Sequence, residues 1–203
     1  IVTPELRREQ GATFTPAAVV HSMLRWTRSQ GVRFARIVDP GAGSGRFVLA
    51  AAHAFPRAEI IAVEKDPEIA RLLRANVAAA GIAARVRVLI QDYRNIELPR
   101  AKGPTLFIGN PPYVRHHDIE LVWKDWYAKA LKAHGLPGSR LAGLHLHFFL
   151  KTKLLAAPGD MGCFITAAEW LDVNYGSAAR AMFTNGLGGQ ALHLIDKKVK
   201  VFE

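Results

Sequence analysis

The chain has 203 residues, half of them hydrophobic, which excludes an intrinsically disordered protein and allows one domain with a sizeable core. Lys and Arg outnumber Asp and Glu by 27 to 17, and the resulting formal net charge of +10 favours a polyanionic partner such as nucleic acid. No apolar run approaches the roughly 18 residues of a membrane span, and no signal pattern is found, so we expect a cytoplasmic protein without a membrane partner.

Strands and helices alternate in the first half of the sequence. Thr15 before Pro16 is typical of an N-cap followed by proline at the first helical position, which predicts a helix from residue 16 to residue 26. The next expected elements are a strand at 35–39, a helix at 46–55, a strand at 59–64, a helix at 67–80 that ends at Gly81, and a strand at 85–90.

The second half continues this alternation. We expect a strand at 105–109, amphipathic helices near 118–133 and 143–157, a strand at 163–166, a helix at 175–183 and a late strand at 191–196. Because the strands are continuous apolar runs separated by helices, the sequence predicts an α/β protein with three layers. This is a Rossmann-like fold, a mostly parallel twisted sheet with helices on both faces, and such sheets bind ligands beyond the carboxyl ends of their strands.

A glycine-rich turn, DPGAGSGRF at 39–47, joins the first predicted strand to a helix. Glycines at such a turn let the backbone approach a ligand closely. The turn lacks the Lys-Ser or Lys-Thr of a phosphate-binding Walker loop, and its G-x-G-x-G spacing differs from the G-x-G-x-x-G of dinucleotide-binding proteins. A plain tight turn remains an alternative.

Acidic residues lie at the ends of the next two predicted strands. Glu64 could accept hydrogen bonds from both hydroxyls of a ribose, although it could also be an ordinary acid near the helix cap Asp66. Asp92 could accept from an adenine amino group, with Tyr93 against the purine, or could be a turn residue. Together with the glycine turn, these residues favour the binding of an adenosine moiety.

Five segments in this order, GATFTP, DPGAGSGRF, VEKDP, QDY and GNPPYVR, resemble the class I S-adenosylmethionine-dependent methyltransferases. More closely, they resemble the gamma group of adenine-N6 DNA methyltransferases from restriction–modification and phage-defence systems. The resemblance spans residues 10–202, and it implies S-adenosylmethionine as cofactor and double-stranded DNA as partner.

The resemblance also implies roles for individual residues. Residues 14–15 and 39–43 would line the methionine end of the cofactor, Glu64 would hold the ribose, and residues 92–93 would bind the adenine. Phe148 would pack on the adenine, with a core aromatic as the alternative. The implied cofactor-binding residues are Phe14, Thr15, Asp39, Pro40, Gly41, Ala42, Gly43, Glu64, Asp92, Tyr93 and Phe148.

The tetrad Asn110, Pro111, Pro112 and Tyr113 would carry the catalysis. The amino group of adenine is a poor nucleophile because its lone pair is delocalised into the ring. The side-chain oxygen of Asn110 and the carbonyl of Pro111 could each accept one amino hydrogen and so localise the lone pair on nitrogen. Two rigid prolines would hold these acceptors in place.

A base inside a duplex must leave the stack to reach such a site. Tyr113 could stack on the flipped base, and the resemblance places Phe202 on its other side, although Phe202 could also be a core residue at a strand edge. We predict no metal site, because His116 and His117 are adjacent and His145 and His147 face different sides of a helix.

Alternatives with the same cofactor are methyltransferases that act on RNA bases or on a glutamine side chain of release factors, since these also carry the Asn-Pro-Pro-Tyr tetrad. A nicotinamide dehydrogenase is disfavoured by the glycine spacing, and a non-catalytic binding module by the intact tetrad. The FTP segment and the late segment at 168–176 favour DNA. We expect residues 1–203 to be the catalytic domain of a longer protein whose target recognition domain is absent here, so that this piece alone binds cofactor but methylates weakly or not at all.

Overall fold

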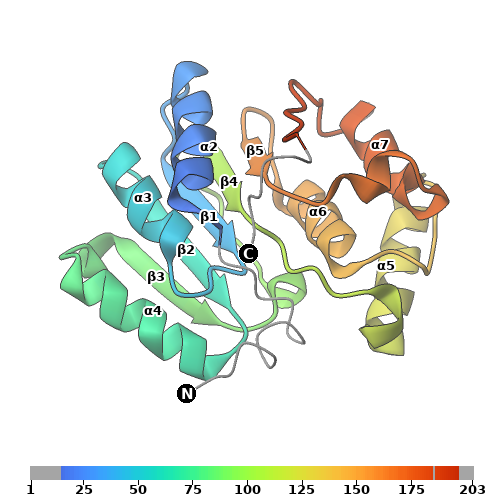
Figure 1. Cartoon of the computed structure of the whole chain (residues 1–203), viewed down its shortest axis with the longest axis horizontal. Helices are drawn as coiled ribbons and strands as arrows, with labels where there is room; N and C mark the ends of the chain where they lie inside the picture. Colours follow the sequence, from blue (N-terminus) through green and yellow to red (C-terminus); the bar gives the residue numbers. More distant parts are fainter. Residues whose placement is uncertain (1–14, 185, 197–203) are drawn as a thin grey trace.

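The computed structural model of the chain describes residues 15–184 and 186–196. Within them, five parallel strands form one sheet in the order β3-β2-β1-β4-β5 (Figure 1). The strands are β1 (Arg36–Pro40), β2 (Glu59–Glu64), β3 (Val86–Ile90), β4 (Thr105–Gly109) and β5 (Met161–Phe164). Val38 of the central strand β1 is in register with Ile61 of β2 and Phe107 of β4. The predicted α/β class is confirmed.

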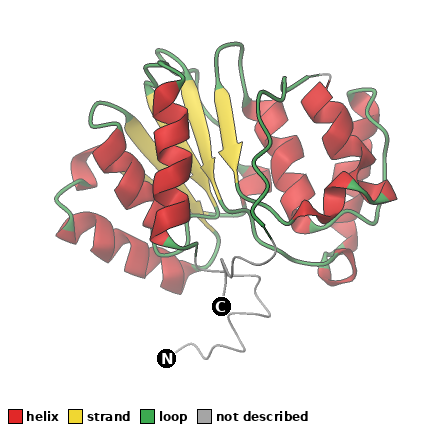
Figure 2. Ribbon diagram, turned by 45° about the horizontal axis from the view of Figure 1, so that its top comes forward, coloured by secondary structure: helices red, strands yellow, loops and turns green. Residues whose placement is uncertain are grey.

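Helices cover both faces of the sheet, which gives the three predicted layers (Figure 2). On one face lie α2 (Ala17–Ser29), α3 (Arg46–Ala54) and α4 (Pro67–Ala79), whose apolar side chains share a core with β1 and β2. On the other side lie α5 (Leu121–Ala133), α6 (Leu144–Leu155) and α7 (Ser177–Thr184). Short 3-10 turns complete the connections.

The sequence explains why these helices start and pack as they do. Asp66 caps α4, since its carboxylate accepts from the backbone N–H groups of Glu68 and Ile69, and Pro67 occupies the first turn. Helix α6 is apolar around most of its circumference, with every residue from Leu144 to Leu150 buried. Such a helix needs partners on all sides, and α6 packs both on the sheet and in a second core with α5 and α7.

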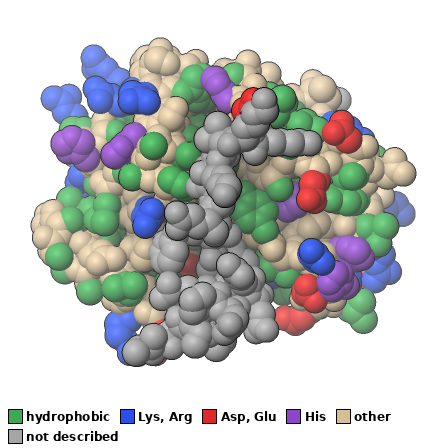
Figure 3. All heavy atoms as spheres, in the orientation of Figure 1, with side chains coloured by type: hydrophobic (Ala, Val, Ile, Leu, Met, Phe, Trp, Pro, Cys, Tyr) green, Lys and Arg blue, Asp and Glu red, His purple; other side chains and the backbone are tan. Residues whose placement is uncertain are grey.

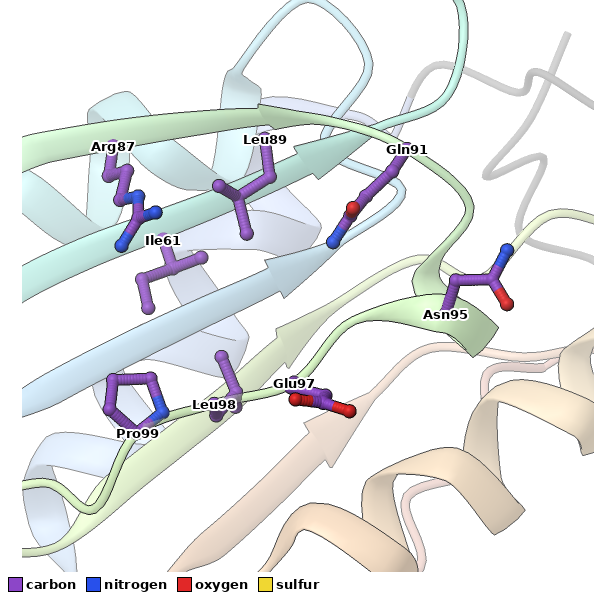
Figure 4. Close-up of a pocket in the computed structure, with 8 residues that line it drawn as sticks. All are labelled: Ile61, Arg87, Leu89, Gln91, Asn95, Glu97, Leu98 and Pro99. Carbon is purple, nitrogen blue, oxygen red and sulfur yellow. The ribbon is translucent and has the colours of Figure 1, made fainter.

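The connection from β3 to β4 contains only the short turn η2 (Tyr93–Asn95). It leaves a cavity of about 340 Å³ on the β2–β3 face of the sheet. In Figure 4, Arg87, Leu89 and Gln91 extend from β3 and its end toward the opposite wall at Leu98 and Pro99. This cavity lies beside the strands and does not include the glycine turn or the Asn-Pro-Pro-Tyr tetrad.

Two local predictions are wrong. Pro16, and not Thr15, is the N-cap of α2, and proline has no polar side chain to form a capping hydrogen bond; the hydroxyl of Thr15 instead accepts a hydrogen bond from Asn110. Residues 191–196 form no strand; Leu192 and Leu194 are exposed, since no neighbouring strand pairs with them among the described residues. None of the helices in the described parts is long and apolar enough to span a bilayer.

Candidate active site

The glycine turn is held against the end of β2. Gly41 and Gly43 adopt positive φ angles of 76° and 54°, which favour glycine at these positions. The backbone N–H groups of Gly41 and Ala42 both donate to the carbonyl of Val63, at 2.9 and 2.8 Å. Pro40 is buried at the end of β1, so the turn begins where the central strand stops.

Glu64 connects this turn to the start of α4. One carboxylate oxygen accepts from Gly43 N and the other from Asp66 N, both at 2.9 Å. Each oxygen retains a lone pair that could accept from a ligand hydroxyl. Glu64 therefore fixes the loop geometry and could bind a ribose at the same time.

Residues far apart in the sequence meet over Gly41. A methyl group in place of a hydrogen on Gly41 would lie 3.5 Å from the ring of Phe148 and 3.6 Å from Pro112. Asn110 extends the same cluster, because its Nδ2 donates to Thr15 Oγ1 at 3.1 Å. This bond places the nitrogen end of the amide at Thr15, and the oxygen Oδ1 is buried. Arg46, from α3, donates to the carbonyl of Thr15 at 2.8 Å.

Asp39 lies at the centre of this edge and is only 1 % exposed. Neither of its carboxylate oxygens has a hydrogen-bond partner among the residues that the structure describes. Burial, and secondarily the charge of Glu64, raises the pKa of Asp39 well above its usual value. Gly109 leaves room for this carboxylate, since a methyl group there would lie 2.8 Å from Asp39 Oδ1. An unpartnered buried carboxylate is suited to a cationic ligand.

Asp92, at the end of β3, is already paired within the protein. Its Oδ1 accepts from the backbone N–H and the Nε of Arg94, both at 2.9 Å, and its Oδ2 accepts from Nη2 at 2.6 Å. The Arg94 guanidinium lies 3.8 Å from the ring centroid of Trp123 on α5. Arg94, Trp123 and Arg46 were not predicted from the sequence. For Arg94, the Asp-x-Arg spacing at a strand end is a signal that could have found it.

Tyr93 and Phe148 pack together, with ring centroids 5.0 Å apart. Tyr93 is 2 % exposed, and its hydroxyl forms a hydrogen bond with Thr152 of α6 at 3.0 Å. Burial raises its pKa, and the bond to Thr152 partly offsets this. Phe148 is also buried, and a methyl group on Gly41 would lie 3.5 Å from its ring, so of these two rings we assign Phe148 to the candidate site.

Tyr113 is half-buried beside the tetrad. Its hydroxyl donates to the carbonyl of Ile165 at 3.4 Å, and burial raises its pKa to about 12. The ring of His145 lies 6.1 Å from that of Tyr113, and burial lowers the His145 pKa to about 4. Tyr113 therefore remains a neutral aromatic ring at physiological pH, which suits stacking on a base.

Two predicted residues, Phe14 and Phe202, lie outside the described residues. Pro111 is buried, and Pro112 lies next to Gly41, so the tetrad is anchored at the end of β4. In the parts of the chain that the structure describes, no group of three or more His, Cys, Asp or Glu residues could hold a metal ion.

Comparisons with known proteins extend this picture. The family described as Eco57I restriction-modification methylase matches residues 86–202, which is more than half of the chain. The chain belongs to this family. Its cofactor is S-adenosylmethionine.

Relatives and structures agree with the family. The Type II methyltransferase M.XamI of Xanthomonas campestris pv. amaranthicola is 58 % identical over 95 % of this chain, which spans 36 % of that protein. A release factor glutamine methyltransferase of Bordetella pertussis (strain Tohama I) is 35 % identical over 53 % of the chain and 38 % of its own length. The chain thus spans about a third of these relatives. A putative RNA methyltransferase structure from Pyrococcus horikoshii matches 77 % of this chain and 64 % of its own, with a TM-score of 0.52 and 21 % identity, which shows the class I methyltransferase fold.

The residues at the sheet edge fit this cofactor. Asp39 supplies a buried carboxylate that no described residue neutralises, and S-adenosylmethionine carries an ammonium and a sulfonium. A side chain at Gly41 would fill the space beside Phe148 and Pro112. Acceptors at Glu64 and Asp92 follow on successive strands of the sheet, β2 and β3.

Proposed function

We propose that this chain transfers a methyl group from S-adenosylmethionine to the N6 amino group of a flipped-out adenine in double-stranded DNA, as the catalytic domain of a gamma-group methyltransferase. The observation that carries the proposal is that Pro112 of the tetrad lies beside Gly41 of the glycine turn, while Asn110 of the tetrad is hydrogen-bonded to Thr15. This brings the candidate base-binding tetrad next to the candidate cofactor site. The identity to the Type II methyltransferase M.XamI, over nearly the whole chain, supports DNA as the substrate.

In the proposed arrangement, residues of this chain bind the cofactor in three places. Asp39 and residues 41–43 hold the methionine part, with Thr15 and Phe14 beside it, Glu64 holds the ribose hydroxyls, and Asp92 accepts from the adenine. Phe148 packs on the adenine ring, and the ring of Tyr93 packs against Phe148. The bound cofactor supplies an electrophilic methyl group on its sulfur.

The tetrad acts on the target. The Asn110 side-chain oxygen and the Pro111 carbonyl each accept one hydrogen of the adenine amino group, which localises the nitrogen lone pair. The prolines fix both acceptors, so little reorganisation is needed when charge develops on nitrogen. Tyr113 stacks on one face of the flipped base and Phe202 on the other, which offsets about 1–3 kcal/mol per stacked ring of the cost of flipping. The alkylated nitrogen then loses a proton readily, and no metal takes part.

The charge of the chain supports a nucleic-acid partner. On the face drawn in Figure 3, the densest group of Lys and Arg side chains lies at the upper left, on the side of α2 and α3, whereas Asp and Glu lie mainly toward the right. With a net charge of +10, such a surface would attract the phosphate backbone. We further propose that the protein acts in the cytoplasm and that target recognition resides outside these 203 residues.

A second candidate function is methylation of a glutamine side chain or an RNA base. The match to release factor glutamine methyltransferases favours it, but at a lower identity and over about half of the chain. A planar amide or base amine would use the same acceptors at Asn110.

The test supplies methyl-labelled S-adenosylmethionine to the 203-residue chain, and to a longer form that includes it, with separate pools of DNA, RNA and protein. We expect label in DNA as N6-methyladenine, slowly for the shorter form. Asn110→Ala should reduce the rate by about 100-fold or more, as expected for the loss of a preorganised acceptor, and leave the affinity for S-adenosylhomocysteine unchanged. Label in RNA or protein alone would contradict the proposal.

A further inference from the structure

The adenine end of the candidate site contains an ion pair between a buried arginine and a partly buried carboxylate, which cofactor binding alone does not require. Arg94 is 7 % exposed and lies two residues after Asp92. Its backbone N–H, Nε and Nη2 all donate to the Asp92 carboxylate, at 2.9, 2.9 and 2.6 Å. The 3-10 turn η2 makes this possible, because it folds the Arg94 side chain back onto its neighbour.

The guanidinium is fixed from a second direction. The Trp123 ring of α5 lies 3.8 Å from its central carbon, which is a close cation–π distance. Its remaining nitrogen, Nη1, is buried and has no hydrogen-bond partner within residues 15–184 and 186–196. Buried ion pairs contribute little net stability, since the desolvation cost cancels much of the attraction. The arrangement therefore points to control of orientation more than to stability of the fold.

The three hydrogen bonds from Arg94 leave the Asp92 carboxylate with one unoccupied acceptor position. A carboxylate offers about four lone-pair positions, two on each oxygen. Arg94 occupies both on Oδ1 and one on Oδ2. The Asp92 side chain is 20 % exposed, so part of it is open to a ligand. One acceptor position matches one N–H donor.

We propose that Arg94 is a positioning residue that directs Asp92 Oδ2 to the amino group of the cofactor's adenine and thereby selects adenine over a 6-oxo purine. The inference rests on the proposed function, because it assumes that Asp92 lies at the adenine. The Trp123 ring packs on the Arg94 guanidinium, the guanidinium fixes the Asp92 carboxylate by hydrogen bonds, and the carboxylate accepts a hydrogen bond from the purine amino group.

The charge state of Asp92 fits this role. Burial raises the pKa of Asp92, but the hydrogen bonds and charge of Arg94, together with the charge of Lys65, outweigh burial, and the net pKa is lowered. The carboxylate is then an acceptor only. A 6-oxo purine presents a carbonyl oxygen at that position, which repels the carboxylate and leaves it unpaired, so it should bind more weakly.

The experiment compares two ligands that differ at this one position. Calorimetric titration of the 203-residue chain uses S-adenosylhomocysteine and S-inosylhomocysteine, whose purine carries oxygen in place of the amino group. The wild type should prefer the adenosyl ligand by about 10- to 100-fold, the range expected for one unpaired buried polar group. Arg94→Gln should reduce this preference toward equal affinity, and Arg94→Lys should restore part of it.

Arg71→Gln is the matched control. Arg71 donates two guanidinium hydrogen bonds to the carboxylate of Glu68, but this pair is exposed on α4. The variant should leave both affinities unchanged. Trp123→Leu, which keeps Arg94 but removes its support, should also lower the preference and covers the case in which Arg94→Gln does not fold.

The outcomes separate the inference from the proposed function. If folded Arg94→Gln and Trp123→Leu keep the wild-type preference, or lose both ligands in the same ratio, Arg94 is a structural residue and the inference is wrong. If the wild type binds neither ligand, the proposed cofactor site fails, and the inference fails with it. A wild type that binds both ligands equally would overturn the inference and leave the cofactor site intact.

Discussion

Two carboxylates lie at the same edge of the sheet and differ in what surrounds them. Asp39, at the end of β1, is buried and has no hydrogen-bond partner among the described residues, and its pKa is raised. Asp92, at the end of β3, accepts three hydrogen bonds from Arg94, and its pKa is lowered. Asp92 therefore has a charged partner, Arg94, whereas Asp39 has none among the described residues.

This difference separates two tasks of a binding site. An unpartnered buried carboxylate destabilises the folded protein and is compensated only when a cationic ligand arrives, so it should contribute strongly to affinity. A carboxylate that is already paired costs less and has fixed geometry, so it should contribute mainly to selectivity. The two ends of the proposed cofactor site can be tested separately on this basis.

The largest expected effect comes from removing the charge of Asp39. Asp39→Asn should weaken the binding of S-adenosylhomocysteine by about 10- to 100-fold, as expected for the loss of a bond between charged groups. The same variant should raise the free energy of unfolding by about 1 kcal/mol, because it removes a buried unpaired charge next to Glu64. Calorimetry measures the first effect and urea denaturation the second.

The matched control for Asp39→Asn is Asp118→Asn, at an exposed position in the turn after the tetrad. It should change neither quantity. If Asp39→Asn binds the ligand as tightly as the wild type, the claim that Asp39 contributes strongly to affinity is wrong.

The pH dependence should also distinguish the two ends. Because the pKa of Asp39 is raised in the free protein, and the ligand ammonium favours the ionised form, affinity should rise with pH through that pKa and a proton should be released on binding. The stability of the free protein should change with pH in the opposite direction. The folded state binds the Asp39 proton more tightly than the unfolded state does, so stability falls as pH rises above the Asp pKa of the unfolded chain, about 3.9.

Calorimetry in buffers of different ionisation enthalpy measures the released proton. Asp39→Asn should abolish the release, whereas Asp92→Asn should leave it in place, because the pKa of Asp92 is already low in the free protein. Equal proton release by both variants would show that Asp39 does not titrate on binding.

The smallest effect is expected at Tyr93, which lies next to Asp92 in sequence but is packed in the core. Tyr93→Phe removes the hydrogen bond to Thr152 and should lower the free energy of unfolding by about 1 kcal/mol. Affinity for S-adenosylhomocysteine should not change, because the ring that packs against Phe148 remains. A loss of affinity without a loss of stability would instead assign the hydroxyl to the ligand site.

Sequence reasoning succeeded where local patterns decide the structure. The apolar runs, the glycine turn and the Asp66-Pro67 cap predicted the β1–β3 half closely, because each depends on near neighbours. It failed at 191–196, where an apolar alternation lacks a strand to pair with in the described residues. It also missed the tertiary partners: Thr15 accepts a hydrogen bond from Asn110, and the Arg94 guanidinium packs on Trp123 of the distant helix α5.

A crystal structure of the chain with S-adenosylhomocysteine tests the central claim most directly. We predict that the amino group of the methionine part lies at Asp39, the ribose hydroxyls on Glu64, the adenine amino group on Asp92 Oδ2, and the sulfur facing the Asn110 side chain. A ligand seated instead in the cavity between Arg87 and Leu98, or a sulfur remote from Asn110, would contradict it.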